Sequence, residues 1–166
     1  MFHDGSVDFD KLKSLVEWHI QQGSDALIAC GTTGEASTLN DEEHIAVIEA
    51  VVKQAAGRIP VIGGTGSNNT QHGIHLSQEA ERVGADALLV VTPYYNKATK
   101  KSLVTHYKAI CQSVELPVIL YSVASRTGMN LTYDMVAELK RDSECQRNQR
   151  GQWRYLTNCV YRATSG

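Results

Sequence analysis

The feature that most limits the fold of this sequence is a unit that recurs roughly every thirty residues. In each unit an amphipathic helical pattern leads into a short apolar run, and these runs start near Asp25, Pro60, Asp86 and Pro117. The starts alternate between G-x-D-A-L and I/L-P-V-I. A repeated helix and strand unit of this length is typical of α/β proteins, in which helices cover a parallel sheet.

Local signals place the helices of these units. Five amphipathic stretches begin at residues that suit a helix start, namely Asp8, Asn40, Asn69, Thr99 and Thr132. Asn40 and Glu43 have the spacing of a capping box. Glycines that suit a helix end follow the first three stretches, at Gly23, Gly57 and Gly84, and the fifth stretch fades after Lys140.

The apolar runs at 25–30, 59–64, 86–91 and 116–121 predict strands that are buried on both faces and therefore parallel. Two architectures use such strands, an open doubly wound sheet and a closed eightfold barrel. The first binds nucleotides through a glycine-rich loop, and the only match is "GGTGSN", where Asn69 stands in place of a third glycine. A glycine turn at a strand end explains this motif better than a dinucleotide site.

Charge and composition exclude several classes of partner. The net charge is −2, which gives no basic field for nucleic acid or for an anionic membrane surface. No apolar run approaches the ~20 residues that a membrane span needs, and the start has no signal-peptide pattern, so we expect a cytoplasmic protein. The four cysteines are far apart and are expected to be reduced, with Cys30 and Cys111 as small core residues.

Each predicted strand turns polar at its carboxyl end, in "GTTGE", "GGTG", "TPYYN" and "YSVASRTG". In a barrel these ends meet on one rim, where barrel enzymes carry their chemistry. His72 and His75 lie three apart on a predicted helix, but no acidic ligand completes a metal pattern there, so we predict no metal. Four strands do not close a barrel, so the pattern predicts an incomplete one.

The motifs "GTTGEASTLN", "GTGSNNT", "VTPYYNK" and "LYSVASRTGMNL" occur in this order at these intervals. Together they resemble dihydrodipicolinate synthase (4-hydroxy-tetrahydrodipicolinate synthase), over about residues 4–140. The resemblance implies an α/β fold, a partial (β/α)8 TIM barrel that holds strands two to five of the family, with parallel strands and flanking helices. It also implies a cytoplasmic homotetramer that uses no cofactor.

The family condenses pyruvate with aspartate semialdehyde through a Schiff base between pyruvate and a lysine. By resemblance, Thr33 holds the pyruvate carboxylate, and Thr32 links Tyr121 and Tyr95 in a proton relay. Tyr121 is the expected acid and base, because a phenol beside a polarising partner can give and take a proton. Arg126 would pair with the carboxylate of the semialdehyde through its planar fork.

The end of the chain departs from this pattern. The family's lysine lies in a motif like "GIKEASG", about 28 residues beyond the tyrosine that matches Tyr121. Counting 28 residues from Tyr121 in this chain reaches Gln149, and no lysine follows Lys140. With suitable codons, a shift of one base turns the sequence after Arg141 into "IPNVSGIKEASGDI". We therefore interpret 1–140 as a partial barrel domain and 141–166 as a frameshifted, unstructured tail.

A chain with these ends is expected to be inactive. The family's first strand, which ends in "VTPF", is replaced by "MF", so two strand edges would be open and the product poorly soluble. Lys97 is the nearest alternative amine, but it is expected to point outward. Three other functions stay open: a pyruvate aldolase of the sialic acid or keto-sugar acid lyase type, a non-enzymatic fragment that associates with intact subunits, and a nucleotide-binding domain.

Overall fold

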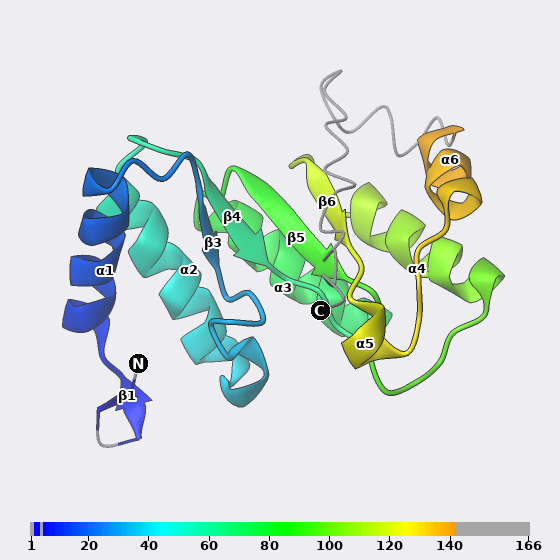
Figure 1. The fold of residues 1–166 in the computed structure, drawn as a ribbon, viewed down its shortest axis with the longest axis horizontal. Helices are drawn as coiled ribbons and strands as arrows, with labels where there is room; N and C mark the ends of the chain where they lie inside the picture. The colour runs from blue at the N-terminus through cyan, green and yellow to red at the C-terminus, as the bar shows by residue number, and fades with distance from the viewer. Residues whose placement is uncertain (1, 4, 142–166) are drawn as a thin grey trace, which may run out of the picture.

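The computed structural model describes residues 2–3 and 5–141 (Figure 1). The remainder of the predicted tail, from residue 142 on, lies outside the described residues. Six strands are assigned: β1 (Phe2–His3), β2 (Ser6–Val7), β3 (Leu27–Ala29), β4 (Val61–Gly64), β5 (Ala87–Val91) and β6 (Val118–Tyr121). The helices are α1 (Phe9–Gln21), α2 (Asp41–Ala55), α3 (Thr70–Arg82), α4 (Lys100–Gln112), α5 (Ala124–Thr127) and α6 (Tyr133–Arg141), with a 3₁₀ turn η1 (Ala36–Thr38).

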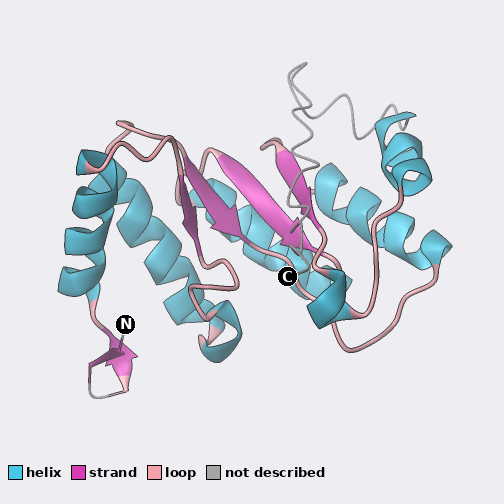
Figure 2. Cartoon of the chain, viewed as in Figure 1, coloured by secondary structure: helices cyan, strands magenta, loops and turns pink. Residues whose placement is uncertain are grey.

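The main sheet is parallel and its strands follow one another in chain order, β3-β4-β5-β6. Leu27 pairs with Val61, Ile62 pairs with Ala87, and Leu88 pairs with Val118. A helix separates each strand from the next, and α2, α3 and α4 follow one side of the sheet (Figures 1 and 2). This arrangement confirms the predicted parallel sheet of a partial (β/α)8 barrel.

The predicted helix starts are confirmed because they depend on local hydrogen bonds. Asp8 accepts from the Lys11 amide at 2.9 Å. The Asn40 side chain accepts from the Glu43 amide at 2.9 Å, and the Glu43 carboxylate accepts from the Asn40 amide at 3.1 Å, which completes the capping box. Asn69 and Thr99 cap α3 and α4 in the same way. Each cap satisfies amides that have no partner within the helix.

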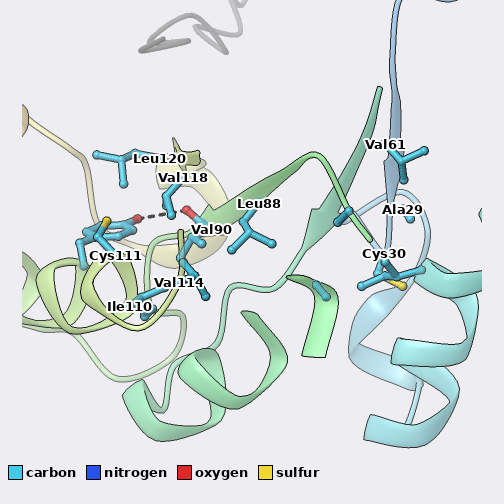
Figure 3. Packing of buried hydrophobic residues seen from close by; sticks show 14 of the residues in the cluster. Ala29, Cys30, Val61, Leu88, Val90, Ile110, Cys111, Val114, Val118 and Leu120 are labelled. Atoms are coloured by element: carbon cyan, nitrogen blue, oxygen red, sulfur yellow. Dashed lines mark hydrogen bonds between the residues drawn. The ribbon is translucent and has the colours of Figure 1, made fainter. Parts of the chain in front are cut away.

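The core lies between the helices and one face of the sheet. Strand residues of this face alternate along the sequence and are buried, namely Ala29, Val61, Leu88, Val90, Val118 and Leu120. They pack with helix residues such as Ile48, Leu103 and Ile110. On α4, the buried Tyr107 hydroxyl donates to the Val90 carbonyl at 3.3 Å (Figure 3). Cys30 and Cys111 are buried in the core, as predicted.

Three features differ from the sequence-based expectation. The short hairpin of β1 and β2 and the single-turn helix α5 carry no periodic pattern and were not predicted. Burial of the strands on both faces is wrong for Ile28, which is 54 % exposed, because the helices cover only the other face. Among the described residues, no helix has the length and apolar character needed to cross a bilayer.

Candidate active site

The loop after β3 presents two adjacent hydroxyls at a tight turn. Gly34 donates its amide to the Gly31 carbonyl at 3.0 Å, and Thr32 and Thr33 are exposed at the corner of this turn. Cys30 before the turn and Glu35 after it have φ of 56° and 53°. Non-glycine residues in this region cost about 1 kcal/mol or more each and collect at functional loops. The two threonines are therefore held on a backbone of defined, strained shape.

The loop after β4 lies directly against its neighbours. A Cβ on Gly64 would stand 2.2 Å from the Cys30 carbonyl oxygen, and a Cβ on Gly66 would stand 2.4 Å from the Val91 amide nitrogen. Between them, Thr65 is fully buried and accepts a hydrogen bond from the Ser77 hydroxyl at 2.9 Å. These glycines allow three strand ends to approach closely, whereas the sequence predicted only a glycine turn at this strand end.

The loop after β5 exposes two tyrosines. Tyr94 is 39 % exposed and Tyr95 is 96 % exposed, and Tyr95 has φ of 72°. The loop itself is anchored to the β4 loop by a reciprocal amide pair: Asn68 donates to the Tyr94 carbonyl at 3.2 Å, and Asn96 donates to the Asn68 carbonyl at 3.1 Å. The exposure of Tyr95 is thus fixed by an ordered loop whose backbone is held on both sides.

The segment after β6 carries the remaining predicted residues. Tyr121 is the last residue of β6 and is partly exposed, and Arg126 is exposed on α5. Next to Arg126 in the sequence, the Thr127 hydroxyl accepts a hydrogen bond from the buried Thr92 hydroxyl at 3.1 Å. This pair ties α5 to the end of β5. The sequence placed this stretch in a loop, whereas the structure gives it one helical turn.

All five predicted residues therefore lie in segments at the carboxyl edge of the sheet, but their side chains do not form one cluster. Strands β3 and β6 are three strand spacings apart, about 14 Å along the sheet. Tyr95 is too exposed to contact Thr32 or Tyr121. No hydrogen bond among the described residues joins these three hydroxyls. Lys97 also lies near this edge, with its Cε 3.6 Å from the position that a Cβ on Gly128 would occupy.

The two histidines excluded as a metal pair differ in their surroundings. His72 bridges Ser67 and Asp41, with Nδ1 3.0 Å from the serine hydroxyl and Nε2 2.9 Å from the carboxylate, so it is a linking residue and not the solvated one expected. His75 is exposed as predicted. Within the residues that the structure describes, no group of three His, Cys, Asp or Glu side chains could hold a metal ion.

Comparison with known proteins agrees with this layout. The model of the Dihydrodipicolinate synthetase family matches residues 1–146. The chain belongs to this family. Its curated relatives include 4-hydroxy-tetrahydrodipicolinate synthases of a Thermoanaerobacter species, 53% identical over 140 residues, and of Neisseria meningitidis, 50% identical over 139 residues. These alignments cover 84% of this chain and 47% and 48% of the relatives.

Solved structures of the family superpose well on the described fold. The chloride-inhibited dihydrodipicolinate synthase of Acinetobacter baumannii, complexed with pyruvate, is 53% identical with a TM-score of 0.82, covering 85% of this chain and 48% of that one. The enzyme of Aquifex aeolicus is 49% identical with a TM-score of 0.84, covering 87% and 49%. The chain thus spans about half the length of its dihydrodipicolinate synthase relatives.

Some residues that position the loops at the carboxyl edge of the sheet were not identified from the sequence. The Thr92–Thr127 pair and the Asn68–Asn96 exchange join loops that are 35 and 28 residues apart in the chain. Asn68 and Asn96 stand inside the quoted motifs "GTGSNNT" and "VTPYYNK", and this was the only available signal. These residues act by fixing one loop against another, and contacts between such distant segments leave no periodic signal in the sequence.

Proposed function

We propose that this chain carries one half of a 4-hydroxy-tetrahydrodipicolinate synthase active site, which condenses pyruvate with aspartate semialdehyde through a lysine Schiff base in lysine and diaminopimelate biosynthesis. The proposal rests mainly on the loops at the strand ends. They lie within the region that matches the family, and in them Cys30, Glu35 and Tyr95 all have positive φ. Ordered strain of this kind is concentrated at functional sites. By the same resemblance, the enzyme is cytoplasmic and needs no cofactor.

Each strand-end residue has a proposed part. Thr33, on the exposed corner of the β3 loop, would bind the pyruvate carboxylate with its hydroxyl and the backbone N–H groups of the turn. Thr32 would connect Tyr121 and Tyr95 only in an assembly with a neighbouring subunit, because within one chain Tyr95 is too exposed to contact Thr32. Arg126, exposed on α5, would hold the carboxylate of the semialdehyde in a bidentate pair.

The relay is needed because the reaction moves several protons. A carbinolamine must gain a proton to lose water and form the imine, and the imine must lose a carbon-bound proton to become the enamine that attacks the aldehyde. Tyr121 is suited to both transfers, because it lies at the end of β6 on the sheet face that the helices leave open. The new alkoxide then takes a proton, and hydrolysis of the imine returns the free amine.

The exposure of Tyr95 means that its proposed role in the relay requires a neighbouring subunit. A phenol that is 96 % exposed cannot relay protons in a pocket shut from water unless something covers it. We infer that a neighbouring subunit supplies the cover, in line with the homotetramer that the resemblance implies. The exposed position and the fixed φ of Tyr95 support an intermolecular role for this side chain.

This chain is proposed to be inactive, since it has no lysine at the position where the family forms its imine. Borohydride reduction with pyruvate tests this. We expect no covalent adduct on the wild-type chain, and a Lys97→Arg variant serves as the control because Lys97 lies near the same sheet edge. An adduct that mass spectrometry maps to any lysine would overturn the proposal of inactivity, and its loss in Lys97→Arg would assign it to Lys97.

The frameshift hypothesis is tested with a repaired gene. A one-base correction after Arg141 should restore "GIKEASG" and with it adduct formation and synthase activity. In that repaired enzyme, Tyr121→Phe should lower kcat by about 100-fold or more, whereas Tyr133→Phe, 86 % exposed on α6, should leave it unchanged. A panel with aspartate semialdehyde and the aldehydes of keto-acid lyases then separates the synthase from other pyruvate aldolases.

A further inference from the structure

The inference concerns residues 67–69, the last part of the connection between β4 and α3, which we call the 67–69 segment. Asn69 caps α3 by accepting from the amides of Gln71 and His72 at 3.0 and 3.3 Å. The Ser67 hydroxyl accepts from the Asn69 amide at 3.1 Å, and Ser67 is only 2 % exposed. Asn68 lies between these two residues, so its backbone is fixed on both sides.

His72 joins the 67–69 segment to the start of α2. Its Nε2 atom lies 2.9 Å from a carboxylate oxygen of Asp41, and its Nδ1 atom lies 3.0 Å from the Ser67 hydroxyl. An ionised carboxylate can only accept, so the neutral ring donates from Nε2, and Nδ1 accepts from Ser67. A serine, a histidine and an aspartate in line resemble the nucleophilic triad of hydrolases, but the buried Ser67 cannot reach a substrate. The three side chains therefore have a role in holding the segment.

Asn68 extends this order to the loop after β5. Its side chain donates to the Tyr94 carbonyl at 3.2 Å, and its own carbonyl accepts from the Asn96 side chain at 3.1 Å. The Asn96 amide also donates to the Tyr94 carbonyl, at 2.9 Å. These bonds hold the residues on either side of Tyr95, whose φ of 72° is one that a tyrosine rarely adopts. A path of hydrogen bonds and adjacent residues thus leads from Asp41 to the backbone around Tyr95.

We propose that His72 is a positioning residue for Tyr95, acting through Ser67 and Asn68 on the loop that carries the tyrosine. The inference rests on the proposed function only for the use of Tyr95 in the relay. The ring of His72 is suited to this role because it bonds at the same time to the start of α2 and to the 67–69 segment. Without it, Ser67 would keep only its bond from the Asn69 amide.

The position of the loop should also depend on the proton of His72. A protonated ring carries a hydrogen on both nitrogens and donates to Ser67, so the hydrogen of the serine loses its acceptor. Within the residues that the structure describes, no other acceptor bonds to this buried hydroxyl. Protonation therefore keeps the bond to Asp41 and disturbs the 67–69 segment.

Other titratable residues interact with the start of α3 and the 67–69 segment from each neighbouring element: Asp41 and His44 on α2, Tyr94 in the loop after β5, and His106 on α4. His75 lies one turn further along α3 and is exposed. Between about pH 5.5 and 7.5, histidine is the side chain that ordinarily changes charge. The test must therefore separate His72 from the other histidines.

Nuclear magnetic resonance of the isotope-labelled 166-residue chain follows both ends of the path. We expect the Asn96 resonances to shift with a midpoint between about pH 5.5 and 7.5 that equals the midpoint of the His72 ring in the same sample. His72→Gln should remove this midpoint and keep the loop ordered, because its amide can donate to Asp41 and accept from Ser67 but does not titrate. Asn68→Ala should remove the midpoint at Asn96 while His72 still titrates.

His72→Ala should make the Asn96 amide exchange with solvent about 10-fold faster, because both bonds of the ring are lost. His75→Ala is the matched control on the same helix and should change neither the exchange rate nor the midpoint. Equal exchange rates in these two variants, or a midpoint at Asn96 that persists in His72→Gln, would overturn the proposal. Because no measurement involves turnover, either result leaves the proposed function to its own test.

Discussion

The Nε2 atom of His44 lies 2.7 Å from the carbonyl oxygen of Gly64, and the ring must donate because a carbonyl can only accept. The backbone carbonyl of His44 accepts a hydrogen bond from the Cys30 thiol at 3.5 Å. Burial raises the pKa of Cys30 to about 12, which keeps this thiol protonated as a donor. One buried residue near the start of α2 therefore connects the ends of β3 and β4, from which the first two loops of the site emerge.

This connection predicts a measurable cost for His44→Ala. The substitution leaves the Gly64 carbonyl without its donor and removes a buried ring, so the free energy of unfolding should fall by about 2 kcal/mol. Urea denaturation followed by circular dichroism measures it. His75→Ala is the control: its side chain is exposed on α3, and the change should stay within about 0.5 kcal/mol. Equal losses in the two variants would contradict the assigned role.

Acid should destabilise the fold at a pH set by its histidines. Burial lowers the pKa of both His44 and His106, so below about pH 6.5 the unfolded chain binds protons that the folded chain does not. The free energy of unfolding should therefore fall as the pH drops from 7.5 to 5.5, which lies above the usual range of carboxylates. Urea midpoints across this interval measure the slope, and a constant midpoint would refute the prediction.

His106→Phe isolates one of the two contributions. The Nδ1 atom of His106 lies 2.9 Å from the Thr70 hydroxyl, but its buried Nε2 has no partner in the described structure. Phenylalanine fits a similar volume and does not titrate, so the acid slope should become shallower while His44 still contributes. An unchanged slope would mean that His106 takes no part in the acid effect.

Much of the fold could be predicted because its signals are local. Asp8, Asn40 and Thr99 each cap a helix through a residue three positions away, so the sequence spacing alone specifies the contact. The parallel sheet followed from the apolar runs. The exposure of Ile28 does not follow from the apolar run itself, because an apolar strand has the same sequence whether or not a second layer covers it; it was expected only from the incomplete barrel, whose half-lined interior faces water.

The position of the candidate residues at the strand ends was predictable, but their mutual geometry was not. The motifs placed Thr32, Tyr95 and Tyr121 at strand ends, and the structure puts all three in segments at the carboxyl edge. Their separation depends on which strands intervene, and the outward position of Tyr95 depends on a positive φ that a tyrosine rarely adopts. Whether the three act as a relay stays a prediction.

Gly64→Ala should destabilise the chain far more than Gly63→Ala. The added methyl at 64 would stand 2.2 Å from the Cys30 carbonyl oxygen, and backbone cannot move aside without disturbing β3. At 63 it would meet the Ala80 methyl at 3.3 Å and the Ile48 side chain at 3.4 Å, which need to shift only slightly. We expect about 3 kcal/mol for Gly64→Ala and about 1 kcal/mol for Gly63→Ala by urea denaturation. A reversed order would refute this account of the β3–β4 contact.

Thr127→Val should loosen the segment that carries Arg126. Thr127 accepts from the buried Thr92 hydroxyl at 3.1 Å and donates to the Met129 carbonyl at 3.1 Å, so valine removes both bonds while keeping the shape. The expected loss is about 1 to 2 kcal/mol, because the Thr92 hydroxyl is left buried without its acceptor. Since α5 has a single turn, the effect should concentrate there, and trypsin should cut after Arg126 sooner than in the wild type. Thr105→Val is the control: its exposed hydroxyl bonds only to the Lys101 carbonyl on the same helix, so cleavage after Arg126 should not change. If both variants were cut at the same rate there, Thr127 would have no special part in holding Arg126 at the sheet edge.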